Sequence, residues 1–175
     1  MVDQPDHGDD STSEGRTVQH SEVVMSKVFA PEHAGPGGIY AHGGEIIKLM
    51  DTAAGVAAVR HSHSPVATLR VEAINFFNPI RVGNYVTARA RLTYTSQSSM
   101  EVQVKVSTED LINEKSWEAC TAYFIIVALN KTGKPKMVPS LLISSEEERK
   151  RFEAGKERHD TCRLDERFRA LCGID

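Results

Sequence analysis

One long apolar helical pattern constrains this sequence more than any other feature. Residues 43–60 open with two glycines, and the apolar residues that follow cover most of the circumference of a helix. A helix that is apolar nearly all round is usually buried. The polar exceptions are Lys48, Asp51 and Thr52. We therefore expect one buried helix at the centre of the domain, with a carboxylate inside it.

Strand patterns surround this helix. Residues 66–74, 85–95 and 100–107 alternate apolar with polar side chains, which is typical of antiparallel strands with one buried face. Residues 117–129 are apolar on both faces near their end, which favours a central strand or one inside an interface. An earlier strand is expected over residues 19–29. The order predicts an α+β fold in which an antiparallel sheet wraps around one long helix.

The two ends of the chain differ from this central part. Residues 1–16 are polar and acidic and have few apolar groups to bury, so we expect a disordered tail. Residues 17–143 then form the domain. Residues 144–175 form a charged C-terminal helix, whose sparse apolar anchors, Phe152, Leu164 and Phe168, predict loose packing against the domain or a neighbouring subunit.

Composition narrows the class of function. The net charge of -3 provides no overall basic field, so nucleic acid is not favoured as a partner. No apolar stretch is long enough to span a bilayer, and the first residues lack the apolar core of a signal peptide. Three cysteines without a CxxC pair favour reduced thiols in a cytoplasm. No group of potential ligands has a spacing that implies a metal.

Two positions on the long helix are candidates for chemistry. Gly43 and Gly44 open the helix, where free N–H groups and the positive end of the dipole suit a carbonyl oxygen that becomes negative. The alternative is that these glycines only permit a tight turn. Asp51 follows two turns later, where an ionised carboxylate is costly unless it is paired or lies at a polar cavity. The alternative here is a salt bridge to Lys48, three residues earlier.

The strand after the helix supplies further candidates. Thr68 and Glu72 are expected to point to the face opposite Leu69 and Val71, where they either line a site or face solvent. Phe76 lies near the end of this strand, shortly before a proline that prevents further pairing.

Together these segments resemble the hotdog-fold acyl-CoA thioesterases, in the acyl-CoA hydrolase branch that includes the bacterial YciA-type enzymes and the two-domain brain-type hydrolase. The resemblance runs from about Val18 to Glu157. The matching segments are His42–Asp51 (HGGEIIKLMD), Val71–Glu72, Phe76–Ile80, Gly83, Tyr94–Ser96, Ser99–Val102 and Pro139.

The resemblance implies a hotdog fold and hydrolysis of an acyl-CoA, with no cofactor beyond the CoA of the substrate. The family's catalytic aspartate falls on Asp51, and the N–H groups that polarise the thioester carbonyl fall on Gly43 and Gly44. Thr68, Glu72 and Phe76 are the residues expected to contact substrate. The family's site lies between two protomers and the family commonly forms hexamers. We therefore expect a homodimer as minimal unit and a hexamer built as a trimer of dimers, since an open sheet edge favours pairing.

The loop before the glycine pair departs from the family pattern. Many members carry an asparagine there, which faces the aspartate across the dimer interface, but residues 31–44 contain none. In this respect the chain resembles the C-terminal half of the two-domain enzyme, which supplies the aspartate. His42 or a water molecule is expected in the role of the asparagine. The resemblance leaves open whether Asp51 activates water as a general base or attacks as a nucleophile.

Two other functions are possible on the same fold. A non-catalytic acyl-CoA binder or transcriptional sensor is the main alternative, but a sensor would carry a helix-turn-helix segment, which residues 1–16 cannot form. A hotdog dehydratase depends on a histidine with a distant acid, and no such pair is indicated. Hydrolysis of an acyl-CoA in the cytoplasm is therefore the predicted function.

Overall fold

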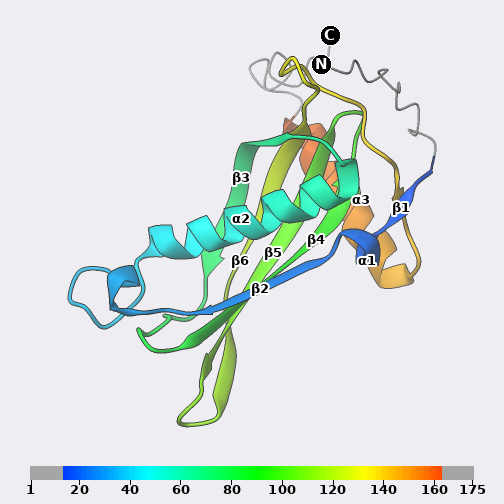
Figure 1. Ribbon diagram of the computed structural model, residues 1–175. Helices are drawn as coiled ribbons and strands as arrows, with labels where there is room; N and C mark the ends of the chain where they lie inside the picture. Colours follow the sequence, from blue (N-terminus) through cyan, green and yellow to red (C-terminus); the bar gives the residue numbers. More distant parts are fainter. Residues whose placement is uncertain (1–13, 163–175) are drawn as a thin grey trace, which may run out of the picture.

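The computed structural model describes residues 14–162. Five antiparallel strands form one sheet in the order β2-β4-β5-β6-β3, and the sheet curves around the long helix α2 (Figure 1). This confirms the predicted fold class. The bounds are Val23–Val28 for β2, Gly43–Ser62 for α2, Val66–Phe76 for β3, Tyr85–Thr95 for β4, Ser99–Asp110 for β5 and Lys115–Ala128 for β6. None of the helices in this described range is long and apolar enough to cross a membrane.

Helix α2 buries one face against the sheet. The residues on this face are small or unbranched at Cβ, apart from one isoleucine, and therefore allow a close approach; they include Ile46, Leu49, Met50, Ala53, Ala54, Ala57 and Ala58. The opposite face of the helix is exposed and carries Asp51, Thr52, Val56 and Val59. The expectation of a helix buried nearly all round is therefore wrong for the single chain, because its sheet covers only one side.

Short elements near the N-terminus were not predicted from the sequence. Strand β1 (Arg16–Thr17) pairs in parallel with β7 (Leu141–Leu142), and the turn of helix α1 (Val18–Ser21) precedes β2. The expected strand over residues 19–29 is therefore shorter. Arg16 is ordered, contrary to the predicted tail, because its guanidinium donates to carbonyl groups at the end of α2. Residues 1–13 of that tail lie outside the described residues.

Helix α3 (Glu146–Cys162) lies on the other side of the sheet from α2 (Figure 1). Arg158 donates two hydrogen bonds, of 2.9 and 2.8 Å, to the fully buried carboxylate of Glu101, and its guanidinium stacks 4.0 Å from the centre of the Tyr123 ring. A Cβ on Gly155 would lie 2.7 Å from Glu101, so only glycine permits this close approach. The helix is thus firmly anchored rather than loosely packed. The rest of the predicted helix, residues 163–175, lies outside the described part of the chain.

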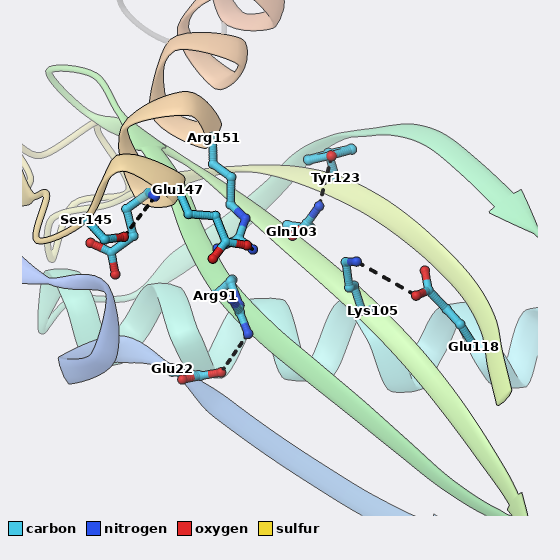
Figure 2. Close-up of polar contacts among 10 residues, drawn as sticks. Glu22, Arg91, Gln103, Lys105, Glu118, Tyr123, Ser145, Glu147 and Arg151 are labelled. Atoms are coloured by element: carbon cyan, nitrogen blue, oxygen red, sulfur yellow. Dashed lines mark hydrogen bonds and ion pairs between the residues drawn. The ribbon is translucent and has the colours of Figure 1, made fainter. Parts of the chain in front are cut away.

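The face of the sheet below α3 is polar. Figure 2 shows an ion pair between Arg91 and Glu22 at 3.3 Å, another between Lys105 and Glu118 at 3.8 Å, and a hydrogen bond from Gln103 to the hydroxyl of Tyr123 at 2.9 Å. Two of these contacts join side chains of the neighbouring strands β5 and β6, and the third links β4 to Glu22, which precedes β2. The candidate residues on α2 lie on the opposite side of the sheet from this network.

His61 connects the end of α2 to two other segments. Its ring is fully buried, and Nε2 donates to the carbonyl of Pro139 at 3.0 Å, because a carbonyl can only accept. Nδ1 therefore accepts the hydroxyl of Ser21 at 2.9 Å. Burial lowers the pKa of His61 below its ordinary value, so the folded protein favours the neutral ring.

We predict that stability falls as the pH drops below the ordinary histidine pKa of about 6.5. Above that pH the ring is neutral in both the folded and the unfolded chain. Below it the unfolded chain binds a proton that the folded chain resists, and the loss continues until the pH passes the lowered folded pKa. Urea unfolding at several pH values measures this slope. A His61→Gln variant should be less pH-dependent than the wild type, and equal slopes would contradict the assignment.

Candidate active site

Asp51 lies on the exposed face of α2 and is held by the next strand. The hydroxyl of Thr68 on β3 donates to Oδ1 of Asp51 at 2.7 Å. Lys48 forms no ion pair with Asp51 or with any other residue from 14 to 162. The salt bridge that was the alternative reading of Asp51 is therefore absent from this part of the chain, and the carboxylate is oriented by a neutral hydroxyl instead.

Glu72 is not brought to this site. Thr68 pairs with Ile126, whose side chain belongs to the core on the α2 side, whereas Glu72 pairs with Tyr123 on the opposite face. A register shift between Thr68 and Arg70 changes the alternation along β3. The expectation that Thr68 and Glu72 share a face is therefore wrong, and Glu72 forms an ion pair with Arg70 at 2.9 Å instead.

The two glycines at the start of α2 differ in the hydrogen bonding of their N–H groups. The N–H of Gly44 donates to Nδ1 of His42 at 2.9 Å, so the imidazole caps the helix. The N–H of Gly43 has no hydrogen-bond partner within the described range. A Cβ on Gly43 would meet only the edge of the Phe76 ring, at 3.9 Å. Gly43 therefore presents the free donor at the positive end of the helix dipole, while the donor of Gly44 is already occupied.

Two hollows lie along α2. The first, of about 360 Å³, is at the start of the helix and is lined by Tyr40, Ala41, Gly43, Ile46, Phe76, Phe77, Asn78, Pro79 and Ile80. The second, of about 600 Å³, contains the Asp51–Thr68 pair and is lined further by Thr52, Gly55, Val56, Val59, Arg60 and Val66. Sequence reasoning did not single out Gly55 or Val59. Gly55 follows Asp51 by four residues and Val59 follows Gly55 by four, and this regular spacing is the signal that could have identified them.

Helix geometry keeps the two candidate groups of one chain apart. Asp51 follows Gly43 by eight residues. At a rise of about 1.5 Å per residue, this places the carboxylate about 12 Å along the axis from the free N–H. Hydrogen-bond reach is about 3 Å. The Gly43 N–H and the Asp51 carboxylate of the same chain therefore cannot both act on one small reacting group.

Comparison with known proteins gives a consistent assignment. A model of the thioesterase superfamily matches residues 39–114. The chain is 40% identical over 148 residues to the cytosolic acyl coenzyme A thioester hydrolase of Mus musculus. The aligned residues make up 83% of this chain but only 39% of the mouse protein. It is 33% identical over 138 residues to YkhA of Bacillus subtilis, described as an uncharacterized acyl-CoA thioester hydrolase, covering 78% of this chain and 79% of that one.

Solved structures agree with this assignment. An acyl-CoA hydrolase from Staphylococcus aureus, in complex with butyryl coenzyme A and coenzyme A, superposes with a TM-score of 0.78 at 26% identity and covers 85% of this chain and 90% of that one. A hexameric acyl-CoA thioesterase without ligand superposes with a TM-score of 0.80 at 26% identity. The match covers 85% of this chain and 94% of that one. These matches confirm the hotdog fold expected from the sequence.

Proposed function

This chain belongs to the thioesterase superfamily, and on that premise we propose that it hydrolyses an acyl-CoA to a carboxylic acid and CoA. The observation that carries the proposal is the Asp51–Thr68 pair. The Thr68 hydroxyl donates to Oδ1 of Asp51 at 2.7 Å and orients this carboxylate on the open face of α2. The relatives named as acyl-CoA thioester hydrolases support it. Since the chain spans about 39% of the mouse relative, carrying that protein's activity over is part of the proposal.

The reaction site is shared between two copies of the chain. The separation of about 12 Å along α2 prevents Gly43 and Asp51 of one copy from meeting at one thioester carbonyl. A second copy related by two-fold symmetry can place its own Asp51 opposite Gly43, which gives two equivalent sites per dimer. Strand β3 is an edge of the sheet and exposes Val71 and Phe76, so edge pairing through β3 supports this arrangement.

Hydrolysis then proceeds by attack of water on the thioester carbonyl. Asp51 takes a proton from water as the water oxygen bonds to the carbonyl carbon, and Thr68 keeps the carboxylate oriented. The oxygen that becomes negative accepts the free N–H of Gly43. The carbon–sulfur bond breaks, and the thiolate of CoA receives the proton from Asp51. In the alternative route, Asp51 attacks the carbon, releases CoA thiolate and forms an anhydride that water hydrolyses.

His42 takes over part of the role of the missing loop asparagine. Its Nδ1 accepts the N–H of Gly44, so the neutral ring carries its proton on Nε2. The ring is exposed beside Gly43, and Nε2–H is available as a second donor to the thioester oxygen. Phe76 lines the hollow at the same helix end, where it contacts the substrate.

We extend the proposal to the assembly and the location of the protein. The hexameric acyl-CoA thioesterase of matching fold supports the proposal of a hexamer. We propose that this hexamer is a trimer of dimers, because the two-fold pair is the expected minimal unit. The cytosolic hydrolase of the mouse supports a cytoplasmic location. The acyl-CoA substrate supplies CoA, and the reaction as written needs no further cofactor.

Asp51→Asn should reduce kcat by about 10²–10⁴-fold, because the amide cannot accept a proton from water. Binding of CoA and the oligomeric mass should be retained. Asp160→Asn, on the exposed side of α3, is the matched control and should keep wild-type turnover. Wild-type turnover by the purified Asp51→Asn variant would contradict the assignment. A wild type that binds acyl-CoA without hydrolysing it would favour the non-catalytic binder.

Gly43→Pro tests the free N–H without breaking the helix. Proline is favourable at the first helical position, and His42 already has the extended backbone, with φ -67 and ψ 130, that a following proline requires. The change removes only the N–H donor, so kcat should fall by about 10²–10³-fold at an unchanged melting temperature. Gly43→Ala keeps the N–H, and its kcat should fall far less than that of Gly43→Pro. Equal turnover of the two folded variants would remove the oxyanion role of Gly43.

A further inference from the structure

The loop after β3, residues 77–80, is tied to two other segments of the chain. The N–H groups of Phe77 and Asn78 both donate to the carbonyl of Ala119 on β6, at 2.8 and 3.2 Å. The N–H of Ala41 donates to the carbonyl of Ile80 at 2.8 Å. The loop is therefore fixed to β6 on one side and to the segment that enters α2 on the other.

The side chain of Asn78 has a defined orientation although it is exposed. Its Nδ2 donates to the carbonyl of Glu118 at 2.8 Å, and because a carbonyl can only accept, the nitrogen is the branch of the amide that faces β6. Asn78 lines the hollow at the start of α2, whereas Glu118 and Ala119 do not. The other branch, Oδ1, is left at this hollow and accepts no hydrogen bond from the described residues 14–162.

The rest of this hollow offers few side chains that form hydrogen bonds. Of the nine residues that line it, only Tyr40 and Asn78 carry a polar side chain. The ring of Tyr40 lies beside Arg81, with the guanidinium 5.7 Å from the ring centre, and its hydroxyl both donates and accepts. An amide oxygen only accepts. Asn78 thus supplies the one pure acceptor among the side chains that line the hollow.

The proposed attack by water needs such an acceptor. One O–H of the water points to Asp51 of a second copy, which lies opposite Gly43. If the other O–H has no acceptor, the water can turn away from the thioester carbon. Two pure acceptors hold both hydrogens and leave a lone pair of the water oxygen to face the carbonyl carbon. Gly43, which lines the same hollow, holds the carbonyl oxygen through its N–H.

We propose that Asn78 holds the attacking water through Oδ1. The inference rests on the proposed thioester hydrolysis at Asp51. Oδ1 accepts one O–H of the water, and Asp51 of the second copy takes the proton of the other as the carbon–oxygen bond forms. The hydrogen that faces Oδ1 stays on the oxygen and becomes part of the carboxylic acid. Asn78 gains no proton, and the bond from Nδ2 to Glu118 keeps its oxygen in place.

A competing nucleophile separates this role from a purely structural one. Wild type and Asn78→Ala are supplied with butanoyl-CoA and hydroxylamine, which converts the ester to the hydroxamic acid and CoA. Both products are measured, and the rates without enzyme are subtracted. Hydrolysis by the variant should fall about 10–10²-fold, because the water is no longer held in line. Hydroxylamine is the stronger nucleophile and depends less on its placement, so the ratio of hydroxamic to carboxylic acid should rise about tenfold.

Two further variants serve as comparisons. Asn78→Asp keeps an acceptor oxygen but loses the N–H that bonds Glu118, so its product ratio should stay close to that of the wild type. A ratio raised as much as in Asn78→Ala would show that the bond to Glu118 is what matters, and would overturn the proposal. Asn113→Ala removes an amide that donates to Asp110 at 2.8 Å in the turn between β5 and β6, and should change neither rate.

An unchanged product ratio in a folded Asn78→Ala variant of wild-type mass would overturn the proposal. An equal loss of both reactions would also overturn it, because a displaced loop slows every nucleophile alike. If Asn78→Ala does not fold, Asn78→Ser withdraws the acceptor in the same way and carries the same expectation. A wild type that hydrolyses none of acetyl-, butanoyl- and palmitoyl-CoA refutes the proposed function and this inference together, whereas an active wild type with an unchanged ratio in the variant refutes the inference alone.

Discussion

The packing of α2 against one face of the sheet determines where every candidate functional group lies. Alanines on the buried face bring the helix close to the strands, and this leaves the opposite face open along its length. Because the helix is a rigid rod, it holds a free N–H at one end and a carboxylate about 12 Å further along. Under the proposed function, this separation means that a single chain cannot complete the site and that a second copy supplies the missing group.

The rest of the fold holds this helix in place. Its C-terminal end is tied down by Arg16 and by the buried ring of His61, and Thr68 on β3 orients Asp51. On the far side of the sheet, Arg158 and Glu101 anchor α3 through a charge-assisted pair. These contacts place polar side chains in fixed positions, as a preorganised site requires, and the loops before α2 and after β3 line the hollow at the start of the helix.

Sequence periodicity predicted the helix and the strands well, because burial against one core imposes regular spacing along each element. It could not predict the register shift next to Thr68, which sends Glu72 to the other face, since a single extra residue in a strand has no periodic signature. It also described α2 as buried nearly all round. Apolar residues such as Val56 and Val59 lie on its open face, and periodicity within one chain cannot distinguish a surface covered by the sheet from one covered by a substrate or a second copy.

A mixing experiment tests most directly whether Gly43 and Asp51 act from different copies. Asp51→Asn and Gly43→Pro are each prepared as inactive homodimers and then mixed under conditions that exchange subunits. A mixed dimer has one site with both groups intact, so random exchange should restore about a quarter of the wild-type kcat. If the two groups acted within one chain, no mixed dimer would contain an intact site. Proven exchange without any recovery of turnover would therefore contradict the shared site.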